Sequence, residues 1–185
     1  MILYHTFTRN RDRAHAALRY YQMRPRGEDE PPRSLFTATE AVSRAEAYRL
    51  IDTHQARGYL AHRLMLSPST SERPEDLQAL TRYVMREMEK EHGETLHWVA
   101  VEHRNTDHPH VHILLRGGRE RDGARAEVRL HRADHIRIKE DGKTYCEIES
   151  RERTRWEQAL SRAAAQSQSD GHERAFDDGR GEIER

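Results

Sequence analysis

The stretch EHRNTDHPHVHILLRG, residues 102–117, contains the most informative pattern of this 185-residue chain. Its second half alternates between two kinds of side chain, and successive residues of a β-strand point to opposite faces of a sheet. His110 and His112 therefore share one face, whereas Val111 and Ile113 share the other. The pattern predicts a strand with an apolar packing face on one side and two imidazoles on the other.

A third histidine, His103, precedes this pair on the preceding strand or turn. Imidazoles that converge on one point outline a metal site. Cys146 is the only cysteine of the chain, which excludes a disulfide framework and a thiolate zinc finger. An all-imidazole set leaves coordination positions open, as suits a cation that acts as a Lewis acid on substrate oxygen. The alternative is a set of solvated surface residues, since a chain with 13 histidines contains some close pairs by chance.

Length and composition favour one domain, because 185 residues are enough for one proper core and too few for two large ones. Hydrophobic and charged residues each make up 35%, so part of the chain is expected to be solvated helix surface or disordered tail. The net charge is zero, yet residues 1–26 carry six arginines against one acid, and 103–132 carry seven against four. These regions would suit a phosphate-handling surface. No signal peptide or membrane-length apolar stretch is found, so we expect a cytoplasmic protein without membrane insertion.

Hydrophobic periodicity and turn residues predict mixed helices and strands. The expected elements are a strand at 1–8, a helix at 11–23, a helix from a capping box of Thr37 and Glu40 to Gly58, a strand at 59–66, a helix closed by Gly93, strands at 96–102 and 110–116, a turn leading into 124–130, a turn at 139–143 and a charged helix at 149–166. The short NTDHP link joins two neighbouring strands as an antiparallel pair. The fold class is therefore α+β, with a central antiparallel sheet of about five strands, the histidine-pair strand near its middle and helices on its apolar side. We expect residues 1–166 to form this domain and the polar, acidic residues 167–185 to be a disordered tail.

Tyrosine is the remaining candidate nucleophile, because the sequence offers no Ser-His-Asp arrangement and no activated cysteine. Tyr20 and Tyr21 lie in the arginine-rich first helix, and their rings must project about 100° apart. Tyr21 continues the apolar stripe of that helix and is expected in the core. Tyr20 lies to one side, freer to reach a site on the sheet. The alternative for Tyr20 is an ordinary half-buried aromatic on the flank of the helix, and the residues of this helix alone favour that alternative.

The order of these segments resembles a known family. ALRYYQMRPRG at 17–27, a strand ending in LSP, then LHWVAVEH and the histidine stretch are similar to the relaxases, the mobilisation nucleases among the histidine-hydrophobe-histidine endonucleases. The resemblance spans about residues 10–130 and is closest over 59–117. It implies a metal-dependent, site-specific endonuclease and strand transferase that nicks single-stranded DNA at a transfer origin in conjugative plasmid mobilisation. A tyrosine of the enzyme would remain linked to the new 5′ end as a phosphotyrosine, and the same complex would later rejoin the strand.

By position, the resemblance assigns His103, His110 and His112 as metal ligands and Tyr20 as nucleophile, with Tyr21 as the alternative. It implies a divalent cation, Mn²⁺ or Mg²⁺ in use, with Zn²⁺, Co²⁺ and Ni²⁺ as alternatives that imidazoles also accept. The family often has an acid two places after its first histidine.

This chain has Asn105 at that place, so Asp107 is our choice of general base. Arginines of the first helix and around the histidine strand would follow the DNA backbone, and the candidates are Arg19, Arg24, Arg104 and Arg116. The expected partners are single-stranded origin DNA and relaxosome accessory and coupling proteins, and we expect the protein to be a monomer.

Two other functions fit parts of the pattern. His108, His110 and His112 alternate as in histidine-triad nucleotide hydrolases and transferases, in which the central histidine attacks a phosphate and no metal is required. That function would leave Tyr20 and His103 without a role. A non-catalytic DNA-binding relaxosome module is the other alternative, and a buried Tyr20 would favour it.

Overall fold

The computed structural model describes residues 1–24, 31–53, 60–69, 71–72, 74–104, 106–121 and 124–177. The chain forms two units, Met1–Cys146 and Glu147–Arg185, which are described separately. The elements are β1 (Ile2–Thr8), α1 (Arg11–Met23), β2 (Leu35–Phe36), β3 (Ala41–Val42), α2 (Arg44–Asp52), β4 (Ala61–Ser67), α3 (Leu77–His92), β5 (Trp98–His103), β6 (His110–Arg116), β7 (Gly118–Arg121), β8 (Ala124–Glu127) and α4 (Arg132–Asp177).

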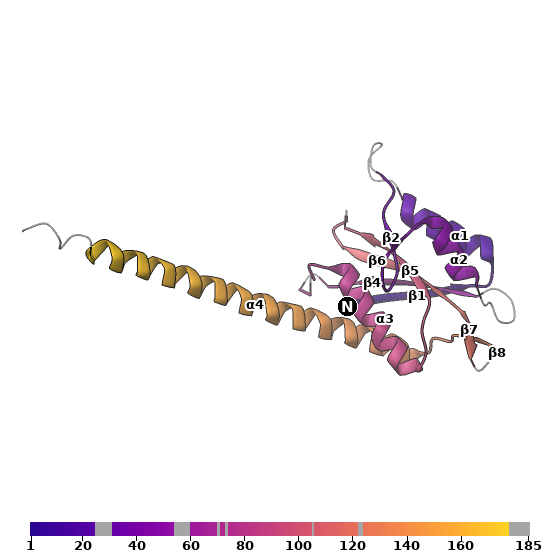
Figure 1. Cartoon of the computed structure of the whole chain (residues 1–185). Coiled ribbons are helices and arrows are strands. Elements are labelled where there is room, and N and C mark those ends of the chain that lie inside the picture. Colours follow the sequence, from indigo (N-terminus) through magenta and orange to yellow (C-terminus); the bar gives the residue numbers. More distant parts are fainter. Residues whose placement is uncertain are drawn as a thin grey trace, which may run out of the picture. The chain divides into compact units, whose positions relative to one another are not determined.

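The first unit is built on a six-stranded antiparallel sheet with the strand order β1-β4-β6-β5-β2-β3 (Figure 1). The predicted α+β class and the central position of the histidine strand are confirmed, since β6 lies between β4 and β5. The sheet has six strands rather than about five because the two-residue strands β2 and β3 extend it beyond β5. The β5–β6 hairpin pairs His103 directly with His110, which brings the third histidine beside the other two.

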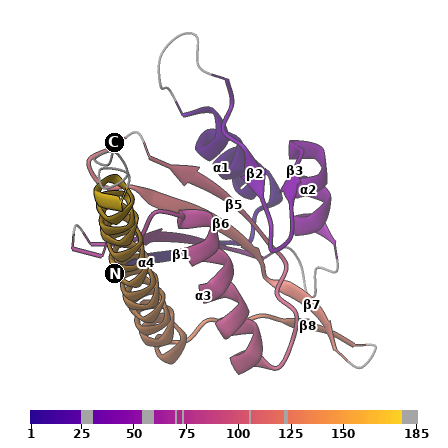
Figure 2. The same cartoon turned by 60° about the vertical axis from the view of Figure 1, so that its left-hand side comes forward.

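Helices cover both faces of the sheet, whereas the sequence predicted them only on the apolar side. Val111, Ile113 and Leu115 pack against α3 and the first part of α4. The face that bears the histidines continues along β6 and β5 with Leu114, Val99 and Val101, and this part packs against α1 and α2 (Figure 2). His112 is partly buried on this face. Its cross-strand neighbours, Met65 on β4 and Val101 on β5, supply apolar surface on either side of it.

The first turn of α2 begins six residues later than predicted. The same four-residue spacing occurs twice, and the capping box is formed by Ser43 and Glu46. Thr37 Oγ1 instead accepts hydrogen bonds from the backbone N–H groups of Thr39 and Glu40, which closes the turn between β2 and β3. The predicted end of this helix at Gly58 lies outside the described residues. At α3 the predicted stop is confirmed, since Gly93 adopts φ 64° at the helix end.

The predicted turn at 139–143 is wrong, because these residues lie inside α4. Gly142 has a packing role there: a Cβ at this position would lie 2.6 Å from the Met1 Cε atom. Helix α4 also continues to Asp177. The expected limits, a domain at 1–166 and a disordered tail at 167–185, stay a prediction. The turn predicted before 124–130 contains a strand of its own, and β7 and β8 form a separate two-stranded hairpin.

Candidate active site

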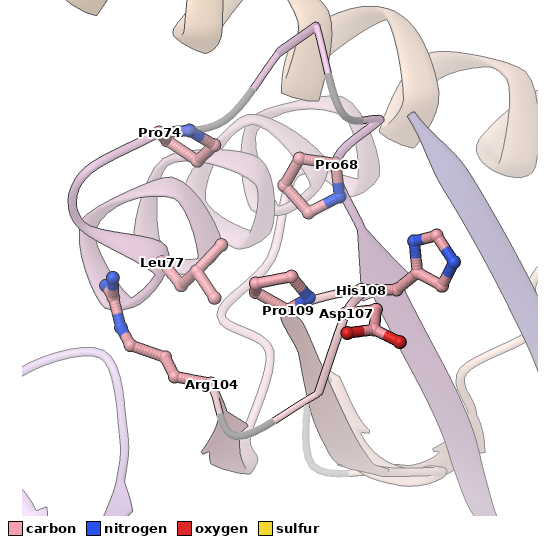
Figure 3. A pocket seen from close by; sticks show the side chains of 7 residues that line it. All are labelled: Pro68, Pro74, Leu77, Arg104, Asp107, His108 and Pro109. Carbon is pink, nitrogen blue, oxygen red and sulfur yellow. The ribbon is translucent and has the colours of Figure 1, made fainter.

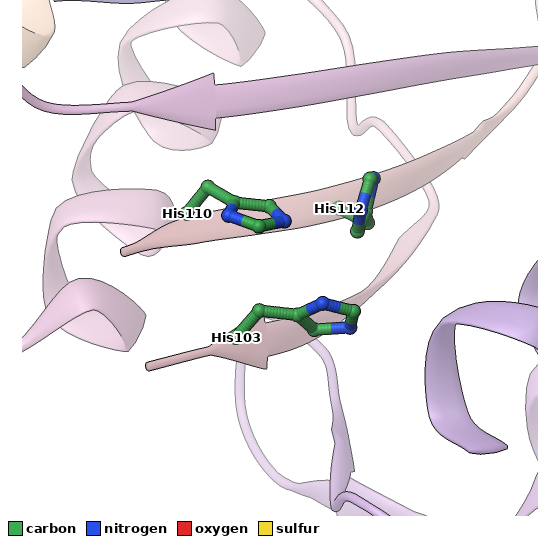
Figure 4. Close-up of side chains that lie close together, drawn as sticks. All are labelled: His103, His110 and His112. Atoms are coloured by element: carbon green, nitrogen blue, oxygen red, sulfur yellow. The ribbon is translucent and has the colours of Figure 1, made fainter. Parts of the chain in front are cut away.

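Three histidine rings gather where the β5–β6 hairpin ends, on the face covered by α1 (Figure 4). The centroid of the His103 ring lies 5.0 Å from that of His110 and 4.9 Å from that of His112, and the latter two are 4.9 Å apart. One ring nitrogen of each residue lies within 4.8 Å of the others. The structure therefore brings together the three residues predicted from the sequence as metal ligands.

Backbone carbonyls hold two of the rings in place. His103 Nε2 donates to the Tyr21 carbonyl oxygen over 2.8 Å, and His110 Nδ1 donates to the His108 carbonyl oxygen over 2.8 Å. Such hydrogen bonds fix the tautomer, so that the second nitrogen of each ring carries a lone pair. His103 Nδ1 is buried and has no hydrogen-bond partner within the described part of the chain. Buried polar atoms of proteins nearly always have a partner, so this lone pair is open to a ligand. The three imidazole nitrogens, which lie within 4.8 Å of one another, fit a divalent cation.

Burial keeps the three rings neutral. It lowers the pKa of His103 to about 4 and that of His112 to about 3, and it lowers the pKa of His110 as well. The positive charges of Arg24 and Arg33 lower all three pKa values further. Because only neutral imidazole coordinates metal, the lone pairs are available at neutral pH.

Helix α1 places Tyr21, not Tyr20, against the histidines. The Tyr21 ring stacks on His112 with 4.0 Å between centroids and 2° between planes. Tyr20 is 56% exposed, and its ring lies beside that of Tyr21. Tyr21 is partly buried and packs against the same core cluster as Leu18, as its place in the apolar stripe predicted, and this cluster lies on the histidine side of the sheet. Burial raises the pKa of Tyr21, while Arg63 acts in the opposite direction.

Asp107 lies in the exposed turn between β5 and β6. It lines a cavity of about 230 Å³ together with Arg104, His108 and three prolines (Figure 3). None of the three clustered histidines lines this cavity. The role of Asp107 as general base stays a prediction.

His108 is exposed and precedes strand β6. Its ring does not belong to the cluster; only its carbonyl oxygen contributes, by accepting from His110. The alternating row required by the histidine-triad alternative is therefore absent from the described strand β6.

The four arginines proposed to bind DNA have different environments. Arg19 and Arg24 are exposed on α1 and directly after it. Arg104 is half exposed and forms an ion pair with Glu102. Arg116 is buried, and its Nε donates to the Gly118 carbonyl oxygen over 2.9 Å, so it holds the chain between β6 and β7 and we withdraw it as a DNA contact.

Arg33 is a charged residue near the histidines that the sequence analysis missed. It is 6% exposed, and its Nη1 donates to the Arg24 carbonyl oxygen over 2.8 Å. The segment 24–35 was interpreted only as a loop. The available signal was the spacing to Leu35: residues two apart in an extended segment point to the same side, so Arg33 shares the buried side of Leu35.

The sheet and its cluster define an α+β domain with a candidate three-histidine metal centre. A family model described as "Relaxase: MobA/VirD2-like, nuclease domain" matches residues 34–166, more than half of the chain. The chain therefore belongs to this relaxase family, whose members nick DNA in mobilisation. The match begins after α1, so it does not include Tyr20 or Tyr21. No curated protein and no solved structure matches the chain.

None of the helices in the described ranges combines the length and the apolar character needed to cross a membrane.

Proposed function

We propose that this domain nicks one DNA strand at a transfer origin through a tyrosine of α1 and keeps the new 5′ end as a phosphotyrosine. The observation that supports the proposal best is the position of α1. This helix places Tyr21 on His112, with Tyr20 beside Tyr21, at a cluster of three neutral histidines. Among the described residues, the buried Nδ1 of His103 has no hydrogen-bond partner.

In the proposed step, the phenol oxygen forms a bond to the scissile phosphorus, and the bond from phosphorus to the 3′ oxygen breaks. The phenol proton passes to a base, and the leaving 3′ oxygen takes up a proton. A bound divalent cation would neutralise phosphate charge as the transition state forms. One ester replaces another, so the freed 3′ hydroxyl can attack the phosphotyrosine and rejoin the strand without a nucleotide cofactor.

Tyr20 remains our proposed nucleophile and Tyr21 the alternative. The exposure of Tyr20 leaves its hydroxyl open to a DNA strand. The contact of Tyr21 with His112 supports the alternative, although its raised pKa means that it needs a base more strongly. Asp107 is the proposed base.

We further propose that Mn²⁺ or Mg²⁺ is the cation in use and that Arg19, Arg24 and Arg104 contact the DNA backbone. On this proposal the protein works in the cytoplasm as a monomer, with relaxosome accessory and coupling proteins as partners. The non-catalytic DNA-binding alternative loses support because Tyr20 is exposed rather than buried.

The test uses a random-sequence, single-stranded DNA library with Mn²⁺ or Mg²⁺. Protein–DNA adducts that survive detergent are isolated, the DNA is digested, and mass spectrometry identifies the modified residue. We expect a nucleotide phosphate on Tyr20, loss of adduct in Tyr20→Phe, and normal adduct in Tyr83→Phe, a control in α3. Modification of Tyr21 would reverse the assignment, and nicked DNA without any covalent adduct would refute the tyrosine mechanism.

A further inference from the structure

A groove adjoins the candidate active site on the side of the edge strand β1. Its volume is about 240 Å³, and it extends from β1 across β4 to the ring of His112. The side chains that face it come from Tyr4, Thr6, Tyr21, Arg63, Met65 and His112. Two of these residues, Tyr21 and His112, also form the edge of the histidine cluster, so whatever occupies the groove also touches the site.

Tyr4 lies in one row with His112. Tyr4 pairs with Met65 on β4, and Met65 pairs with His112 on β6. Directly paired residues point to the same face of a sheet, and two strand spacings amount to about 10 Å. Tyr4 is nevertheless 63% exposed. A large aromatic ring therefore lies open to solvent on the face of the site, a short distance from it.

Arg63 places a positive charge in the same groove. Its Nε donates to Thr6 Oγ1 over 3.1 Å, which orients the guanidinium between β1 and β4. It acts electrostatically on Tyr21, so the charge extends toward the site. Arg24 and Arg33 add positive charge around the histidines themselves.

We propose that this groove binds the nucleotide adjoining the scissile phosphate, with its base stacked on the Tyr4 ring and its phosphate at Arg63. An exposed ring beside a cation is the combination with which proteins bind single-stranded nucleic acid without reading its sequence. No acid among the described residues forms an ion pair with Arg63, so an apolar ligand would leave this charge uncompensated there, whereas a phosphate compensates it. This inference rests on the proposed function, since it assigns part of the substrate to the same site.

The same strand provides a matched control. Phe7 is 59% exposed on β1, but it pairs with His62 and therefore points to the opposite face. Tyr4→Ala and Phe7→Ala remove similar exposed aromatic area from one edge strand. They differ in whether the lost ring faces the groove.

The experiment measures fluorescence anisotropy of a labelled 20-nucleotide oligodeoxythymidine with wild type and variants. Loss of one stacked base weakens binding about 5- to 150-fold, so we expect an increase of this size in Kd for Tyr4→Ala. Tyr4→Phe keeps the ring and should bind like wild type, as should Phe7→Ala. Arg63→Gln should weaken binding and reduce the slope of log Kd against log salt by about 0.7, whereas Arg86→Gln on α3 should not.

The groove assignment is overturned if Tyr4→Ala binds as tightly as Phe7→Ala, or if Tyr4→Phe binds as weakly as Tyr4→Ala. Thermal unfolding of each variant separates a loss of binding from a loss of fold. If wild type binds the oligonucleotide and forms the covalent adduct while Tyr4→Ala is unaffected, only the groove proposal fails. If wild type neither binds DNA nor forms an adduct, the proposed function fails with it.

Discussion

Two groups of three histidines lie on opposite faces of the same sheet, and they differ in how their nitrogens are used. His103, His110 and His112 converge on one point. The other group, His5, His62 and His135, forms a chain in which neighbouring rings are joined by hydrogen bonds of 3.0 and 2.8 Å. The chain ends where His62 Nε2 donates to the Val128 carbonyl oxygen over 2.9 Å.

The comparison shows that clustered histidines can use their ring nitrogens in two different ways. In the chain, both nitrogens of His5 and of His62 are engaged, and neutral rings satisfy every hydrogen bond by donating in one direction. In the convergent group, the two backbone hydrogen bonds leave the second ring nitrogens available within the cluster, including His103 Nδ1, which has no hydrogen-bond partner among the residues that the structure describes. We interpret the hydrogen-bonded group of His5, His62 and His135 as structural and the convergent group of His103, His110 and His112 as functional.

The largest expected difference between the two groups concerns metal binding. His112→Ala should weaken Mn²⁺ binding by more than about 100-fold, because it removes a proposed ligand. Loss of a residue that only hydrogen-bonds to a ligand typically reduces metal affinity by about 10- to 100-fold. His62→Ala should leave the affinity and the stoichiometry unchanged. Isothermal titration calorimetry on protein stripped with EDTA measures both. Retention of tight Mn²⁺ binding in His112→Ala would contradict the assignment of the metal centre.

The second difference concerns stability. His62→Ala should lower the free energy of unfolding by about 2 kcal/mol, because it removes a buried ring and leaves the Val128 carbonyl oxygen and His5 without their partner. Urea unfolding followed by circular dichroism measures the change. His131→Ala, at an exposed position, is the control and should change stability by less than about 0.5 kcal/mol. An equal loss of unfolding free energy in both variants would argue against a structural role for the hydrogen-bonded histidine group.

The smallest difference concerns pH. Burial, together with His62 and His135, lowers the pKa of His5 to about 4. The unfolded chain therefore binds more protons than the folded one between pH 6.5 and 4, so stability falls as pH falls through this window. In His5→Gln the slope of the unfolding free energy against pH should decrease. One proton corresponds to about 1.4 kcal/mol per pH unit, and we expect a smaller decrease because solvent screens the partly exposed ring. Urea unfolding at several pH values with EDTA present measures it, and an unchanged slope would place the titration elsewhere.

Much of the local structure could be predicted from the sequence. The alternation around His110 and His112 required a strand, Gly93 marked the end of α3, and the short link after His103 required an antiparallel hairpin. These features depend on neighbours within a few residues. A local signal that occurs twice is ambiguous. Thr37 and Ser43 are each followed three residues later by a glutamate, as in a capping box, but only Ser43 begins a helix.

The position of the helices on the sheet required the tertiary structure. A stripe of apolar residues shows which face of α1 is buried, but not which face of the sheet it meets, and this placed Tyr21 rather than Tyr20 on His112. Arg116 and Arg33 illustrate the same limit, because sequence shows their charge but not the carbonyl oxygens that hold them inside.

What the sequence determined by itself was therefore the α+β class, the central histidine strand and the set of three histidines, because strand period and hairpin length are local properties of the backbone. Only the tertiary structure decided which tyrosine contacts that set, which arginines remain accessible, and that a second histidine group on the other face is closed by its own hydrogen bonds. These depend on contacts between residues far apart in the chain, which arise when both faces of the sheet are buried.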